Sequence, residues 1–188
     1  MIGKCCICCC VIFSIISLGV GISLIVSLNF LTSGKIMVPE YTVTDAVLNT
    51  FAMTPNKTLD YNLALTIKAE NKYPINTLIN WEKFETVPIY ENEELTTVDL
   101  APFEIQKISK KELNPSYKGM KKLPKTDEEA SKMKSTKVFD IVLRITGRRT
   151  GKVAASKVDI KFTNECKLKV PTKSGGEKFE STKCVRKN

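Results

Sequence analysis

Seven cysteines are the residues of this 188-residue chain best placed to do chemistry. Two of them, Cys166 and Cys184, lie near its end. A bridge between these two would close a loop of about 19 residues and stabilise the fold by roughly 3 kcal/mol, because it restricts the unfolded chain. Such a bridge persists in an oxidising compartment, so the sequence predicts a disulfide in an exported domain.

The other five cysteines stand at the start of an apolar segment. They are Cys5, Cys6, Cys8, Cys9 and Cys10. A zinc site is not expected there, because zinc sites use paired cysteines separated by polar loops rather than a run inside an apolar segment. Two interpretations remain open: thiols at the cytosolic edge of a membrane span are S-palmitoylation sites, or they serve only as small apolar side chains.

Enzymatic chemistry is poorly represented in the sequence. The chain contains no histidine, which excludes Ser-His-Asp and Cys-His catalysis together with histidine metal ligands. It also lacks a phosphate-binding loop, a dinucleotide fingerprint and a GxSxG nucleophile motif. We therefore expect a protein that is not an enzyme and that carries no cofactor or metal.

Two short surface motifs suggest contacts or modification. Asn56-Lys57-Thr58 matches the N-glycosylation sequon, so Asn56 is a predicted glycan site. Arg148 and Arg149 lie in a Gly147–Gly151 segment that reads as the tip of a hairpin, where they would contact an anionic cell-wall polymer or lipid, or else remain simply solvated. No motif supports nucleic-acid binding.

The apolar segment from residue 5 to residue 31 has no charged side chain. As a helix it would be roughly 40 Å long, more than the roughly 30 Å of bilayer hydrocarbon. A cleaved signal peptide would have a much shorter apolar core. We therefore predict a transmembrane signal-anchor over residues 5–31, after a cytosolic N-terminus of residues 1–4. A linker of residues 32–35 would lead to an extracellular domain of residues 36–188 at the plasma membrane.

Period-two alternation of apolar residues dominates the rest of the chain. It is clearest in Leu59–Ala69 and returns in Val138–Thr146. Turn residues recur every 8–15 positions, which gives about seven to nine strands. The sequence thus predicts a mainly β fold, an antiparallel β-sandwich of the immunoglobulin or fibronectin type III kind.

Two local features complete this scheme. Thr126 with Glu129 forms a capping-box pattern, which predicts a short helix over Asp127–Lys134. Near the end of the chain, Cys166–Val170 and Phe179–Val185 read as the two strands of a hairpin that would hold the disulfide across it.

Charge is unevenly distributed along the sequence. Residues 35–103 contain 5 basic and 10 acidic residues, whereas residues 104–188 contain 23 basic and 10 acidic residues. The basic half could attract an anionic partner, or it could form an ordinary solvated surface.

Several stretches resemble plant proteins of the harpin-induced and non-race-specific disease-resistance family, whose outer domain is the late-embryogenesis-abundant type 2 domain. The resemblance rests on Leu48–Ile67, Val87–Tyr90, Asp99–Gln106 and the pair Cys166 and Cys184. Asn71 and Pro102-Phe103 match loose family motifs, while the proline at position 74 and Gln106 are displaced from them. The resemblance implies a fibronectin-like sandwich, a plasma-membrane location and no enzymatic activity.

The resulting hypothesis is a membrane-anchored interaction protein of plant defence or stress response, with protein partners that the sequence does not identify. The alternative is a lipid-binding or lipid-transfer module with a groove between its sheets. A hydrolase is disfavoured, because the chain has no histidine and no hydrolase motif.

Overall fold

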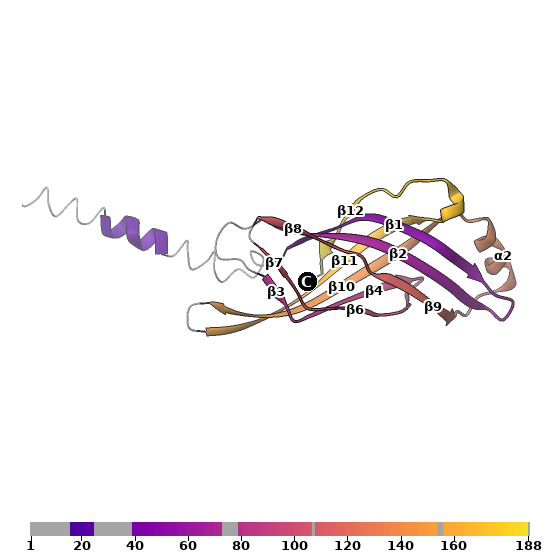
Figure 1. Cartoon of the computed structure of the whole chain (residues 1–188), viewed down its shortest axis with the longest axis horizontal. Coiled ribbons are helices and arrows are strands. Elements are labelled where there is room, and N and C mark those ends of the chain that lie inside the picture. The colour runs from indigo at the N-terminus through magenta and orange to yellow at the C-terminus, as the bar shows by residue number, and fades with distance from the viewer. Residues whose placement is uncertain (1–15, 25–38, 73–78, 107, 154–155, 188) are drawn as a thin grey trace, which may run out of the picture. The chain divides into compact units, whose positions relative to one another are not determined.

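The computed structural model describes residues 16–24, 39–72, 79–106, 108–153 and 156–187, which are coloured in Figure 1. The chain divides into two compact units, Met1–Val38 and Pro39–Asn188. In the first unit, residues 16–24 form a helix.

The predicted membrane-spanning helix over residues 5–31 is wrong. Within the described residues, no helix combines the length and the apolar character that a crossing requires. The finding overturns the single-pass plasma-membrane location inferred from that helix. The remainder of the predicted span, the N-terminal residues 1–4 and the linker at 32–35 lie outside the described residues, as do Cys5, Cys6, Cys8, Cys9 and Cys10.

The second unit is built almost entirely of antiparallel strands, so the mainly β prediction is confirmed. The strands before the helix are β1 (Glu40–Met53), β2 (Thr58–Asn71), β3 (Ile79–Trp81), β4 (Lys83–Tyr90), β5 (Glu93–Glu94), β6 (Val98–Leu100), β7 (Phe103–Ile105), β8 (Ser109–Leu113) and β9 (Ser116–Lys122). After helix α2 (Asp127–Ser135) come β10 (Val138–Val153), β11 (Ser156–Pro171), the 3₁₀ turn η2 (Lys173–Gly175), β12 (Thr182–Lys183) and β13 (Val185–Arg186).

Two sheets form the layers of the unit. The first has the order β12-β1-β2-β8, with β9 continuing the edge beyond β8 on β2. The second has the order β13-β11-β10-β4-β5, with β6 also on β4, and β3 pairs with β7 as a separate ribbon. The chain therefore places β1 and β2 in one sheet, β4 in the other, β8 and β9 back in the first, and the long hairpin β10–β11 in the second. Such crossing connections are typical of immunoglobulin-type sandwiches.

Aromatic side chains on the inner faces join the two layers. At one end, Tyr41 of β1 stacks on Phe162 of β11 with ring centroids 5.4 Å apart. At the end near α2, Phe51 of β1 lies 4.5 Å from Phe139 of β10, centroid to centroid. All four rings are buried, so the space between the sheets is filled at both of these points.

Gly147 makes room for one of these rings, that of Phe162. It pairs with Phe162 on one side and with Phe84 on the other, so it separates two phenylalanines on the inner face of the sheet. A Cβ atom at this position would lie 2.0 Å from the ring of Phe162. The missing side chain therefore provides the space that the Phe162 ring occupies.

Strand β1 contains two irregularities that the alternation of the sequence does not reveal. Its register with β2 shifts between Val43 and Asp45 and again between Leu48 and Thr50. Each shift inserts one residue, which keeps the apolar residues on either side facing inward. The bulges bend the strand, and the second lies beside the groove described below.

The hairpin of β10 and β11 is longer than the sequence suggested. Arg148 pairs with Lys161, and the ladder continues to the pair Val153 and Ser156. The predicted tip at Gly147–Gly151 is therefore wrong, because these residues continue the strand. Alternation ends near Thr146, but backbone pairing does not require an apolar residue at every second position.

The predicted C-terminal hairpin is also wrong. Strand β12 pairs with β1 of the first sheet, whereas β13 pairs with β11 of the second. Cys184 lies between them, and its N–H donates to the carbonyl oxygen of Tyr41 at 2.9 Å. The last described segment thus crosses from one sheet to the other instead of folding back on β11 alone.

Candidate functional site

A groove of about 740 Å³ lies between the second half of β1, the end of α2 and the turn η2. Its apolar lining comes from the exposed Ala52 and from four side chains that are otherwise buried, namely Leu48, Phe51 and Met53 of β1 and Met133 of α2. A volume of this size lies within the range of ligand-binding clefts. In Figure 1, α2 and η2 lie at the same end of the sandwich as the β1–β2 turn.

Three lysines stand on the rim of this groove. They are Lys134, Lys137 and Lys173, all of them exposed, and the described lining residues include no acidic side chain. None of the three makes an ion pair with another described residue. An apolar floor under an unopposed cationic rim favours a ligand that is both anionic and partly apolar.

The backbone of β1 forms one wall of the groove. The outer edge of the strand is paired by β12 at Thr42 and Val43 and by a single parallel bridge between Leu48 and Thr172. Thr172 is held in place because its N–H donates to the carbonyl oxygen of Lys137 at 2.8 Å. Past this bridge the chain turns into η2, and no described strand pairs with the outer edge of β1 as far as Met53.

Helix α2 forms the opposite wall and was correctly predicted from its capping box. The hydroxyl of Thr126 accepts the N–H of Glu129, and the carboxylate of Glu129 accepts the N–H of Thr126 at 2.8 Å. The carboxylate of Glu129 accepts from both the N–H and the hydroxyl of Thr126, and these two bonds hold its pKa below the ordinary value. Among the helix side chains that the structure describes, Met133 is the buried one, with 6 % of its surface exposed, so the contact of α2 with the sandwich depends largely on this side chain.

A second groove, of about 390 Å³, lies on the other side of α2. It has mixed charge, because Lys125 donates to Glu91 at 2.7 Å and lies over the Tyr90 ring. Burial and the neighbouring carboxylate of Glu91 raise the pKa of Tyr90. Lys125 is thus already partnered, and Glu91, Glu129 and Asp140 also line this groove, so it is the less favourable place for an anion.

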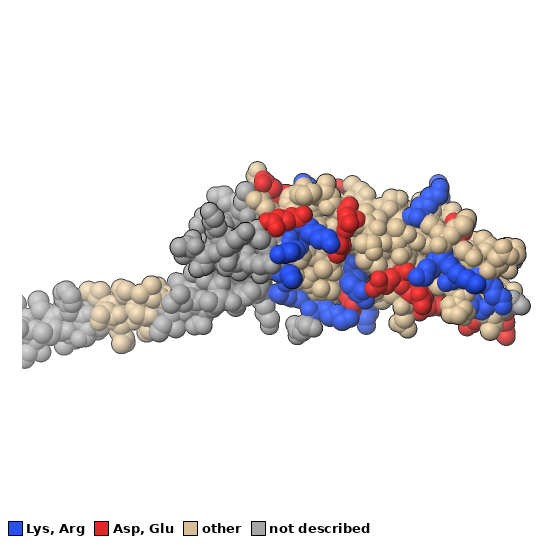
Figure 2. All heavy atoms as spheres, turned by 90° about the horizontal axis from the view of Figure 1, so that it is seen from below, with Lys and Arg blue, Asp and Glu red and all other residues tan. Residues whose placement is uncertain are grey.

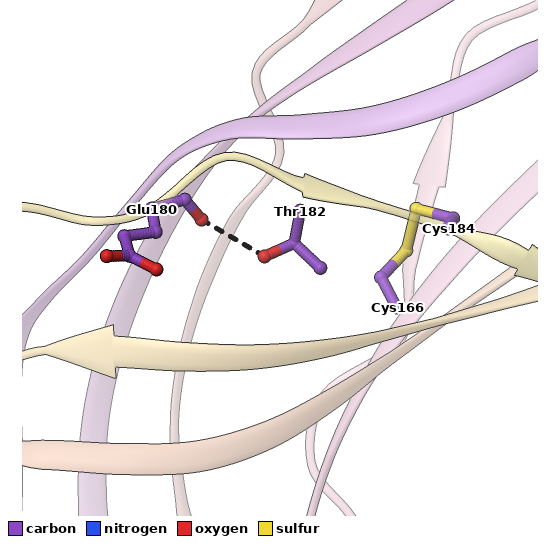
Figure 3. The surroundings of a disulfide bond; sticks show 4 residues. All are labelled: Cys166, Glu180, Thr182 and Cys184. Carbon is purple, nitrogen blue, oxygen red and sulfur yellow. Dashed lines mark hydrogen bonds between the residues drawn. A yellow bond between two sulfur atoms is a disulfide. The ribbon is translucent and has the colours of Figure 1, made fainter.

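The structure joins Cys166 and Cys184 in a disulfide, drawn in Figure 3. Both cysteines are buried. The hydroxyl of Thr182 donates to the carbonyl oxygen of Glu180 at 3.0 Å, a hydrogen bond within the segment that leads to Cys184. The bridge anchors the crossing segment to β11 and lies away from the groove lining.

Asn56 lies exposed in the turn between β1 and β2. Lys57 has a φ of 56°, and its N–H donates to the carbonyl oxygen of Thr54 at 3.0 Å, which closes the turn. The sequon is therefore at a surface tip, where glycosylation stays a prediction.

The structure places Arg148 within β10 and opposite two other basic residues. Its cross-strand partners are Lys161 and Lys83. Directly paired residues lie on the same face, so the three cationic side chains form a row on the outside of the sheet. Arg149 follows in the strand, but its side chain lies outside the description.

Arg148 is not among the described residues that line the groove, and the sequence did not identify the residues that do. The excess of lysine after residue 104 was the available signal, but only the fold selects Lys134, Lys137 and Lys173 from it. Among the described residues there is no cluster of three acidic or thiol side chains suited to a metal ion. No known protein family matches the chain, and a search of curated proteins also found no match.

Proposed function

We propose that this protein is a non-enzymatic binding module and that the groove beside α2 is its ligand site. The observation that carries the proposal is the combination of an apolar floor with three lysines and no acidic lining residue in the described groove. The ligand is accordingly an anion with an apolar part. The absence of histidine from the chain supports the non-enzymatic assignment.

A direct test uses anilinonaphthalene sulfonate, a dye that is both anionic and apolar, with the full chain. We expect its fluorescence to rise on binding and the rise to be largely lost in the triple variant Lys134→Glu, Lys137→Glu, Lys173→Glu. The reversed rim charges repel the sulfonate, whereas the buried floor of the groove is unchanged.

The matched control reverses three exposed lysines elsewhere, Lys118, Lys122 and Lys167, which make no ion pair with a described residue. It has the same net charge as the groove variant, so a general effect of charge would weaken both equally. Equal loss in both variants, or unchanged binding in the groove variant, would contradict the proposed site.

Two classes of ligand share the required chemistry, a protein segment and a fatty acid or lipid. The apolar floor suits either of them, and the lipid class is our second candidate. The resemblance to late-embryogenesis-abundant type 2 proteins is what supports placing this binding in plant defence or stress responses.

A further inference from the structure

The outer edge of β1 is left incomplete inside the groove. Pairing on that edge stops at the bridge between Leu48 and Thr172, although β1 itself continues to Met53. The five residues from Asn49 to Met53 line the groove with one exception, Thr50. An extended edge of this kind is a template for another strand.

The hydrogen bonds of the neighbouring turn show which backbone groups point into the groove. The N–H of Thr54 donates to the carbonyl oxygen of Thr58 at 2.8 Å, so these two residues form a hydrogen-bonded pair. Hydrogen-bonded and non-bonded pairs alternate along an antiparallel ladder. Phe51 and Met53 therefore direct their N–H and C=O groups away from β2, toward the open edge.

We propose that the groove binds an extended acidic segment of a partner protein, which adds as a strand to the outer edge of β1. The inference rests on the proposed function of the groove and specifies its ligand. The backbone of the segment pairs with Phe51 and Met53, its apolar side chains lie on the floor near Met133, and its carboxylates meet the lysines on the rim. Main-chain pairing supplies affinity in this mode of recognition, and the side chains supply specificity.

The backbone groups favour a peptide over a lipid. An alkyl chain lying along β1 would cover the outward N–H and C=O groups of Phe51 and Met53 without bonding to them, and such burial is unfavourable. A peptide satisfies the same groups while it covers them. The bulge between Leu48 and Thr50 bends β1 at the entrance, as bulges commonly do beside binding sites.

The probe for a test is an eight-residue peptide of alternating valine and glutamate, measured with the full chain by fluorescence anisotropy. Its companion carries N-methyl groups on the four central residues, which removes hydrogen-bond donors on both edges but keeps the charges and side chains. We expect the companion to bind at least about tenfold more weakly, equivalent to 1.4 kcal/mol. The groove variant with Lys134, Lys137 and Lys173 changed to glutamate should lose a similar factor, and the Lys118, Lys122 and Lys167 control should not.

Hydrogen exchange provides the second measurement. At saturating peptide, the amides of Phe51 and Met53 should exchange at least about tenfold more slowly, because each gains a partner. Equal binding of the methylated peptide, or unchanged exchange at both amides, would overturn the peptide proposal. The peptide proposal would also be overturned if the peptide does not bind but oleate binds in a way that depends on the three lysines. The proposed function of the groove would then stand, with a lipid as its ligand. If the peptide, oleate and the dye are all insensitive to the lysines, both the peptide proposal and the proposed function fail.

Discussion

A hydrogen bond from the hydroxyl of Tyr117 connects the two sheets. Tyr117 of β9 donates to the hydroxyl of Thr86 in β4 at 2.7 Å, and Thr86 in turn donates to the carbonyl oxygen of Val98 at 3.3 Å. Both side chains are buried, and burial raises the pKa of Tyr117. Each hydroxyl has a partner, as buried polar groups require.

Removing this tyrosine hydroxyl should be measurably destabilising. We expect Tyr117→Phe to lower the free energy of unfolding by about 1 kcal/mol, because Thr86 loses a buried partner. Urea unfolding of this variant, of Thr86→Val and of the double variant forms a thermodynamic cycle. A double variant as unstable as the sum of the two single variants would show that the pair is not coupled.

Glu40 links pH to stability. Its carboxylate accepts from Lys183 at 2.8 Å and from Lys72 at 2.9 Å, and these bonds lower its pKa from the ordinary 4.5. A carboxyl with a lowered folded pKa contributes stability above its unfolded pKa and loses it as the pH falls through the folded pKa. The contribution is therefore present at neutral pH and declines below about 4.5.

We therefore expect Glu40→Gln to be less stable than the wild type at pH 7 and equal to it at low pH, where Glu40 is protonated. Urea unfolding at pH 7 and at pH 3 measures the difference. The control is Glu104→Gln, an exposed carboxylate without an ion pair to a described residue. A constant difference between the wild type and Glu40→Gln at both pH values would contradict the linkage.

At the scale of the element, α2 is a polar helix fixed to the sandwich mainly by Met133. A helix of nine residues is too short to be stable alone in water. Its capping box organises the start, but the packing of Met133 holds the end against β1 and beside both grooves. The helix is therefore the wall of the binding groove that can move most easily.

Met133→Ala should loosen this wall. We expect faster hydrogen exchange throughout α2, with exchange in β10 and β11 little changed, because the substitution removes the buried anchor of the helix but leaves the sheets intact. Ser131→Ala, an exposed position on the same helix, is the matched control. Uniformly faster exchange in all strands would instead mean that Met133 supports the whole fold.

The strand with the clearest alternation and the capped helix were predictable, whereas most of the strand pairing was not. The alternation in Leu59–Ala69 fits β2, and the capping box at Thr126 fits α2. The bulge at Leu48–Thr50 escaped prediction because an inserted residue simply interrupts the period. The destination of residues 182–186 also escaped, since two-residue strands carry no periodic signal. The groove depends on both features, because the bulge bends β1 and because the short strand β12 pairs with only part of the outer edge of β1.

At the scale of the molecule, folding brings the acidic and basic halves of the sequence together. Strands from the acidic and basic halves lie next to each other, and Figure 2 shows a face on which both signs are interspersed. In the part of the chain that the structure describes, acidic residues before position 104 pair with basic residues after it in five ion pairs: Glu40–Lys183, Glu70–Lys110, Glu91–Lys125, Glu93–Lys121 and Glu94–Arg144. Exposed pairs contribute little individually, so their effect is mainly to distribute the charge evenly.

The disulfide acts on the whole domain, because the segment that it anchors pairs with one strand of each sheet. Replacing Cys166 and Cys184 with serine should lower the free energy of unfolding by about 3 kcal/mol. Urea unfolding with and without a reducing agent measures this effect. Reductant should destabilise the wild type by a similar amount and leave the variant unchanged; a wild type indifferent to reductant would contradict the role of the bridge.

The contact between Gly147 and Phe162 constrains how this sequence can evolve. A side chain at position 147 is excluded while a phenylalanine faces it, since its Cβ would lie 2.0 Å from that ring. A lineage that loses the glycine must first, or at the same time, acquire a smaller residue at position 162. Substitutions at positions 147 and 162 should therefore be correlated in homologous sequences, with no side chain at position 147 where position 162 is still phenylalanine.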